Sequence, residues 1–138
     1  MRAHWVAPRD AVTPPATRQR YLEQGLWDDA TLAGRVLFHA RAMPDATAVV
    51  DGAGRYSYGR LGSDAAAVTA GLRELGVEPG TVVSVQLPNR YEFAVLAVAV
   101  QSMGAVIKPL LPNYRARELR AVFTTASPRV IVTPPDYR

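Results

Sequence analysis

The feature that most constrains this chain is the stretch from residue 91 to residue 103, in which nearly every position is apolar. A β-rich run at residues 81–87 precedes this stretch, and a second run at residues 105–110 follows directly after Gly104. An apolar stretch of this length predicts a helix that is covered on most of its sides. A strand, a covering helix and a second strand form a βαβ unit, so we expect parallel strands.

Helices and strands alternate along the rest of the chain as well. After Tyr58, apolar residues recur at steps of three and four, which predicts a helix that ends at Gly76. The expected helices are residues 16–24, 31–43, 58–75, 91–103 and 115–124, and the expected strands are residues 47–51, 55–58, 81–87, 105–110 and 129–133. This order predicts the α/β class, with a mixed or parallel sheet and flanking helices.

Polar residues mark the start of three of the expected helices, and for two of these helices they are the candidate N-caps. Asp29 or Thr31 is expected to cap the second helix. Asn89 stands where the fourth helix should start, and Asn113 is expected to cap the last one. The expected apolar side of the second helix consists of Leu32, Val36, Phe38 and Ala42.

The charge of the chain does not indicate a nucleic-acid partner. The net charge is +4, from 16 Lys+Arg against 12 Asp+Glu. The cations are spread along the sequence without a block of five or six, whereas nucleic-acid binding calls for a clustered basic patch or stripe. We therefore expect no nucleic-acid partner.

The sequence contains no complete catalytic or metal-binding motif. Cysteine is absent, which excludes disulfides and thiolate ligands. His4 and His39 have no second ligand three or four residues away, so no metal site is expected. The glycine-rich phosphate loops and the G-x-S-x-G elbow are also missing. We assign no catalytic residue to the chain.

The sequence offers no segment that would carry the chain into a membrane. The longest apolar stretch, residues 93–100, falls far short of the roughly 20 residues that cross a bilayer. Residues 1–17 mix charges with three prolines and do not resemble a secretory signal. We expect a cytoplasmic protein with an extended lead-in at residues 1–17 and one folded unit at residues 18–138.

The segment KPLLPNYRAR, residues 108–117, is the most suggestive place for a ligand. It leads from the end of an expected strand through a loop into the start of a helix, where α/β sheets usually meet their ligands. Prolines that stiffen the exit of a strand, with arginines in solvent, explain the same composition. Both interpretations remain open at this point.

Several segments carry a resemblance to a known family. They are YLEQGLW at residues 21–27, the DG of residues 51–52 followed by Tyr58 and Leu61, LGVEPGTVV at residues 75–83, LPN at residues 87–89 and MGAV at residues 103–106. In this order and spacing they resemble the opening of the adenylate-forming (AMP-binding) enzymes, which include acyl-CoA synthetases, fatty-acid–CoA ligases and aryl-acid AMP ligases. The resemblance covers most of residues 18–133.

The resemblance implies a ligase that works in two steps. Such enzymes use ATP and Mg²⁺ to convert a fatty or other carboxylic acid to an acyl-adenylate, and then transfer the acyl group to CoA or a carrier protein. It also implies the N-terminal part of a large ligase domain, with an incomplete sheet. By resemblance, Pro112, Asn113 and Tyr114 line the tunnel of the thiol acceptor. Arg138 lies near a position where relatives bind the CoA phosphates, a role that suits the planar fork of arginine.

The family's phosphate loop, its ribose-binding acid and its adenylation lysine have no counterpart in these 138 residues. We therefore expect an N-terminal segment that is inactive alone and binds ATP, Mg²⁺ and CoA at most loosely. We also expect exposed apolar surface that favours self-association. Two alternatives stay open: a non-catalytic module that binds an acyl or CoA ligand or pairs with a separate remainder, and a fragment of an aryl-acid AMP ligase for siderophore synthesis.

Overall fold

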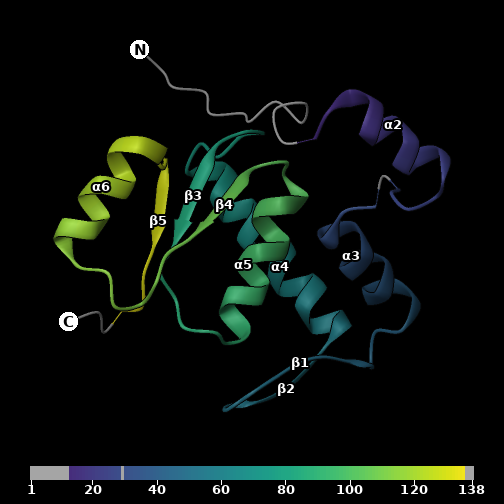
Figure 1. The fold of residues 1–138 in the computed structure, drawn as a ribbon. Helices are drawn as coiled ribbons and strands as arrows, with labels where there is room; N and C mark the ends of the chain where they lie inside the picture. Colours follow the sequence, from purple (N-terminus) through teal and green to yellow (C-terminus); the bar gives the residue numbers. More distant parts are fainter. Residues whose placement is uncertain (1–12, 29, 136–138) are drawn as a thin grey trace.

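The computed structural model describes residues 13–28 and 30–135 as a chain of alternating helices and strands (Figure 1). The helices are α2 (Pro15–Glu23), α3 (Leu32–Ala42), α4 (Tyr58–Glu74), α5 (Tyr91–Ser102) and α6 (Ala116–Ala126). The strands are β1 (Thr47–Asp51), β2 (Gly54–Ser57), β3 (Val82–Val85), β4 (Val106–Pro109) and β5 (Val130–Val132). This order confirms the α/β class predicted from the sequence.

The described strands form a parallel sheet and a separate hairpin. The sheet has the order β4-β3-β5, so β3 lies in the middle. Val83 of β3 stands opposite Ile107 of β4 on one side and Val130 of β5 on the other. The chain leaves β3, passes through α5 and returns as β4, which confirms the βαβ unit. The hairpin pairs β1 and β2 in antiparallel fashion.

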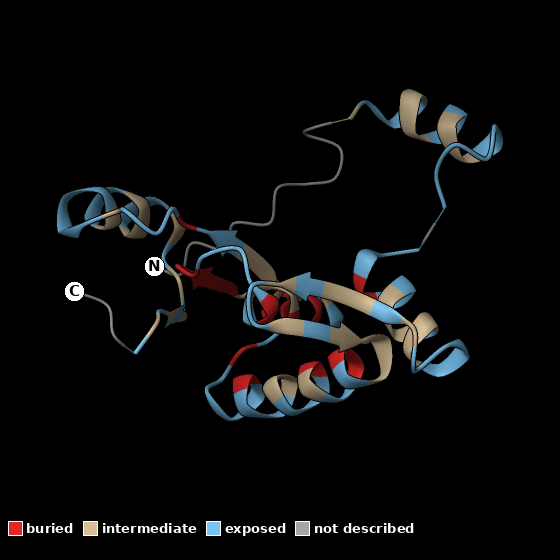
Figure 2. Ribbon diagram, turned by 90° about the horizontal axis from the view of Figure 1, so that it is seen from below, coloured by how far each residue is buried: buried red, intermediate tan, exposed pale blue. Residues whose placement is uncertain are grey.

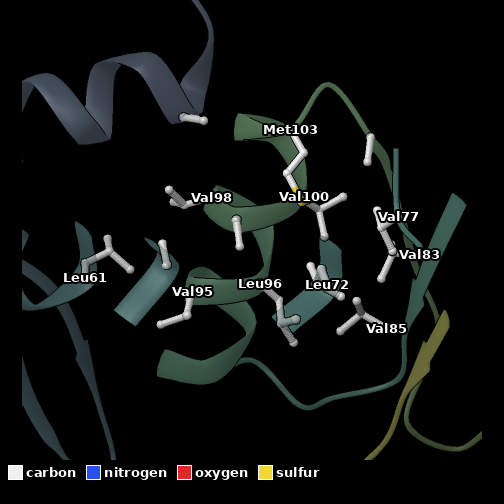
Figure 3. Packing of buried hydrophobic residues seen from close by; sticks show 14 of the residues in the cluster. Leu61, Leu72, Val77, Val83, Val85, Val95, Leu96, Val98, Val100 and Met103 are labelled. Carbon is white, nitrogen blue, oxygen red and sulfur yellow. The ribbon is translucent and has the colours of Figure 1, made fainter. Parts of the chain in front are cut away.

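The core lies between the helices α4 and α5 and one face of the sheet (Figure 3). α5 runs through its middle, with Val95, Leu96, Val98, Ala99 and Val100 buried, as expected for a helix covered on most sides. Val83 and Val85 of β3 are both 0% exposed and face this cluster. α2 and α6 contribute no buried residue (Figure 2).

The start of α3 was predicted correctly, and its buried side only in part. The hydroxyl of Thr31 accepts a hydrogen bond from Gly34 N at 3.0 Å and caps the helix, while Asp29 lies outside the described residues. Leu32 and Phe38, predicted to be buried, are 58% and 64% exposed. The inward side of α3 consists of the buried Ala33 and the half-buried Val36, Leu37 and Ala40. Ala40 fits closely against α4 because α4 has only Gly62 at that point.

The predicted N-cap of α6 was wrong, and α5 begins later than Asn89. α5 begins at Tyr91, two residues after Asn89, and its first amide donates to the Asp51 carboxylate at 2.9 Å. That carboxylate is at the end of β1, so the cap comes from a different element. α6 begins after Arg115, whose amide donates to Glu118 Oε2 at 3.0 Å, while Asn113 stands earlier, in the loop before the helix.

α5 and α6 lie on opposite faces of the sheet. Alternate residues of a strand point to opposite faces, and Val83 and Val85 point to the core under α5. Val82 and Val106 point the other way, where they share a small hollow with Thr125 of α6. The two helices therefore leave neighbouring strands in opposite directions.

Candidate functional site

The candidate site is an open groove at the carboxyl ends of β3 and β4. The chain leaves β3 toward α5 on one face and leaves β4 toward α6 on the other, so the two connections diverge. Open α/β sheets bind ligands in the crevice that such a divergence leaves. The groove has a volume of about 380 Å³, and it is lined by Leu87, Pro88, Asn89, Phe93, Pro109, Leu110, Leu111, Pro112 and Tyr114.

One wall of the groove comes from the β3–α5 connection. Leu87 is buried and anchors this connection in the core, while Asn89 is exposed. Phe93, in the first turn of α5, packs partly on the core and partly lines the groove. The LPN segment that contributed to the family resemblance is therefore a wall of the groove.

The other wall is a tight turn between β4 and α6. Tyr114 N donates to Leu111 O at 3.0 Å, which closes a four-residue turn with Pro112 in its second position. Proline is favoured there because its fixed φ suits the turn. Of the residues predicted from the sequence, Pro112 and Tyr114 line the groove. Asn113 is exposed between them, and Arg138 lies outside the described residues.

Sequence reasoning missed Gln86, which lies beneath this turn. Its side chain is 1% exposed, and Nε2 donates to Leu111 O at 3.0 Å and to Tyr114 O at 2.9 Å. Both carbonyls belong to the ends of the turn. A signal was available, because Gln86 is an amide at the end of the apolar strand VVSV, where a buried polar side chain needs partners.

The described lining of the groove is largely apolar. None of the described lining residues carries a charge at neutral pH, and the polar groups are the Asn89 amide and the Tyr114 hydroxyl. Such a surface fits a narrow, largely apolar ligand with a few hydrogen-bonding groups. Within residues 13–28 and 30–135, no group of three or more His, Cys, Asp or Glu could hold a metal ion.

A second polar cluster surrounds Tyr91, and its groups bind one another. The rings of Tyr56 and Tyr91 stack with centroids 3.8 Å apart, and Arg60 lies over both rings. Tyr91 Oη donates to Asp64 at 2.7 Å, and burial together with this bond raises the pKa of the Tyr91 phenol well above its ordinary value. The phenol is a poor base or acid at neutral pH, so we assign this cluster a structural role.

Asp51 joins that cluster to the hairpin. Oδ1 accepts hydrogen bonds from the amides of Ala53 and Gly54, and Oδ2 accepts from the amide of Tyr91. These bonds, that of Tyr91 first, lower the pKa of Asp51 below its usual value. The aspartate of the DG pair therefore fixes both the hairpin turn and the start of α5.

Comparisons with known proteins identify the family. The family model of the AMP-binding enzymes matches residues 38–138, which is more than half of the chain. The chain belongs to the AMP-binding enzyme family. It is 40% identical over 122 residues to a medium-chain fatty-acid–CoA ligase of Escherichia coli, with 88% of this chain and 22% of that protein aligned. It is 40% identical over 111 residues to a salicyl-AMP ligase of Mycobacterium tuberculosis, with 76% of this chain and 20% of that protein aligned.

Solved structures show the same fold. The apo structure of MbtA from Mycobacterium smegmatis aligns with 85% of this AMP-binding chain and 22% of its own length, at a TM-score of 0.75 and 38% identity. The chain spans about a fifth of the length of the curated relatives that it matches. None of the helices in the described part of the chain is both long enough and apolar enough to span a bilayer.

Proposed function

We propose that this chain supplies the opening part of an ATP-dependent ligase, which activates a carboxylic acid as an acyl-adenylate and transfers the acyl group to CoA. The observation that carries the proposal is the family match over residues 38–138. The groove supports it, because the sheet edge that the family resemblance assigns to the thiol acceptor is hollow. We keep residues 18–138 as one portion of the ligase domain and residues 1–17 as a lead-in to it.

The groove is proposed to hold part of the thiol acceptor. Its walls offer apolar side chains with an amide and a phenol, which fit the uncharged, amide-containing arm of CoA. None of the lining residues that the structure describes is charged, and we propose that Arg138 binds the CoA phosphates. We propose that Pro112, Asn113 and Tyr114 form the acceptor wall.

ATP and Mg²⁺ are proposed to bind outside this segment of the enzyme. The described residues offer neither a glycine-rich phosphate loop nor a cluster of acidic or histidine ligands. Charge stabilisation of that kind carries much of the rate in such transfers, about a hundredfold or more for one lost donor. We therefore propose that the chain alone is inactive. We also propose that the enzyme acts in the cytoplasm.

The substrate is proposed to be a fatty or an aromatic carboxylic acid, with a carrier protein as the alternative acceptor. The relatives include a fatty-acid–CoA ligase and a salicyl-AMP ligase at equal identity, so an aryl-acid AMP ligase for siderophore synthesis is the second candidate. A non-catalytic module that binds an acyl or CoA ligand is the third. The uncharged groove favours it, since binding needs no catalytic group.

The decisive experiment is ATP–pyrophosphate exchange with a panel of fatty and aromatic acids. It compares the 138-residue chain with a version of the protein extended to the length of its relatives. Exchange in the extended protein alone is the expected result, and the acid that drives it identifies the substrate class. Exchange by the short chain would refute its proposed inactivity, and silence of both proteins would favour the non-catalytic module.

A further inference from the structure

We propose that Gln86 is the positioning residue that fixes the turn Leu111–Tyr114 at the mouth of the groove and so sets the opening available to the thiol acceptor. The first part of this proposal stands on the geometry alone. The second part, on the acceptor, rests on the proposed function. Nothing in the groove requires Gln86 to touch the ligand, because it is 1% exposed and lies behind the turn.

The backbone of Gln86 is held firmly in the sheet. It follows β3 directly, and its amide donates to Val132 O of β5 at 2.8 Å. Its neighbours Val85 and Leu87 are both buried on the core side. A side chain that starts from such a fixed backbone can hold a loop in place, since the loop is then tied to the centre of the sheet.

The side chain of Gln86 contacts the turn at two points. An amide nitrogen has two hydrogens, and Nε2 of Gln86 donates to Leu111 O and to Tyr114 O, the first and last residues of the turn. One hydrogen bond would leave the turn free to pivot, whereas two fix its orientation. Pro112 between them stiffens the turn further. The groove wall made by Pro112 and Tyr114 is thus held as a unit.

The simpler alternative is that Gln86 only satisfies a buried amide and contributes to the stability of the whole sheet. A substitution would then loosen all protected amides together. Under our proposal the effect is local, because the core face of β3 is packed by Val83 and Val85, which point away from the turn. The two accounts therefore differ in where the chain becomes mobile.

The test is hydrogen exchange, followed by mass spectrometry, on the 138-residue chain and its Gln86→Met variant. Methionine has nearly the same size and no hydrogen-bond donors, so the packing is kept. Within residues 111–115 the amides of Tyr114 and Arg115 are hydrogen-bonded. We expect these amides to exchange about tenfold to a hundredfold faster, since two hydrogen bonds of about 1 kcal/mol each are lost. The amides of α5 and β3 should keep their protection.

Ser84→Ala is the matched control. Ser84 lies in β3, two residues before Gln86, and its side chain points to the same face of the sheet. It is fully buried, and its hydroxyl has no hydrogen-bond partner in the described part of the chain. This variant should leave the exchange of residues 111–115 unchanged. Unchanged exchange of these residues in Gln86→Met, or faster exchange of α5 and β3 by the same factor, would overturn the proposal.

The acceptor part is tested in the protein extended to the length of its relatives. Gln86→Met should raise the KM for CoA about tenfold and leave the rate of ATP–pyrophosphate exchange within about twofold, because only the second step uses the groove. If the turn exchanges faster in Gln86→Met while the KM for CoA is unchanged, the proposed effect of the turn on the thiol acceptor is overturned. An extended wild-type protein without any exchange refutes the proposed function, and the exchange measurement on the short chain still decides the role of Gln86.

Discussion

The two faces of the three-stranded sheet are covered in different ways. On the face of Val83 and Val85, the helices α4 and α5 bury a continuous apolar cluster. On the opposite face, α6 contributes no buried residue, Lys108 is exposed and Ile131 is 47% exposed. The central strand β3 is nevertheless buried on both faces. The chain thus has one complete core and one partly covered face, with the groove at the edge between them.

The difference shows where the stability of this segment comes from. The face under α5 joins α3, α4, α5, the hairpin and the sheet in one hydrophobic cluster. Burial of apolar surface is the main favourable term in folding, so most of the stability should come from that cluster. The loop that forms the groove wall depends instead on a few polar contacts, such as those of Gln86.

The largest expected difference in stability is between substitutions of leucines on the two faces of the sheet. Leu72 of α4 is buried in the cluster, and Leu119 of α6 is only half-buried. Leu72→Ala should lower the free energy of unfolding by about 2–5 kcal/mol, and Leu119→Ala by less than about 1 kcal/mol. Urea unfolding of both variants measures this. Equal losses would mean that the face under α6 is packed as well as the core.

Glycines of α4 test the close approach of α3. A Cβ at Gly62 would lie 2.9 Å from the Cβ of Ala40, whereas a Cβ at Gly71 would meet nothing within 4 Å. Gly62→Ala should therefore destabilise the chain by about 1–2 kcal/mol, because α3 must shift. Gly71→Ala should stabilise it by up to about 1 kcal/mol through helix propensity. The melting temperatures of the two variants test this prediction. A change in the same direction for both variants would contradict the close packing of α3 on α4.

The carboxylate of Asp51 ties the hairpin to the core and makes stability depend on pH. In Asp51→Asn, Oδ1 still accepts from Ala53, but the new amide nitrogen cannot accept from the amide of Tyr91. The pKa of Asp51 is lowered from 3.8 by folding, so its contribution is present above that pH and is lost as the pH falls through the lower folded-state value.

The pH dependence of the Asp51 contribution is tested by melting temperatures measured from about pH 2 to about pH 7, a range that includes the titration of carboxyl groups. The Asp51→Asn variant should melt below the wild type at neutral pH, and the gap should close in acid. Asp45→Asn removes the same charge from an exposed aspartate and serves as the control, with no gap expected. A gap for Asp51→Asn that stays constant down to the lowest pH would contradict the role of this carboxylate.

Substitution of Ile131 should have the smallest effect on stability. Its effect on self-association should be larger. The Ile131 side chain is exposed on the partly covered face, in the same row as Ser84 and Lys108. Ile131→Lys should change the free energy of unfolding by less than about 0.5 kcal/mol. It should also reduce self-association, which sedimentation velocity measures across a concentration series. Self-association that persists in the variant would place the contact elsewhere.

Patterns that depend on neighbours in the sequence predicted the fold well. The apolar run of α5 and the glycines of the hairpin each act locally, and both elements were predicted close to their observed bounds. The caps failed for the opposite reason. Asp51 caps α5 from forty residues away in the sequence, whereas local reasoning considered only the neighbouring residues and expected the helix to start at Asn89. The position of β5 beside β3 is likewise a property of the assembled sheet.

The place of the loop after a strand pointed to residues 108–117, and the family resemblance pointed to Pro112, Asn113 and Tyr114. Pro112 and Tyr114 line the groove, and their role toward the thiol acceptor stays a prediction. The opposite wall and the support under the turn were missed, because Leu87, Phe93 and Gln86 meet the loop only after the sheet has formed.

We expect the isolated chain to fold around the apolar cluster under α5, which then supports the groove. Site-resolved hydrogen exchange, measured by NMR on the isolated chain, tests this expectation. The amides of α5 and β3 should exchange only through global unfolding, while those of α6 should exchange about a hundredfold faster or more. Uniformly slow exchange through α6, or rapid exchange throughout α5, would contradict it.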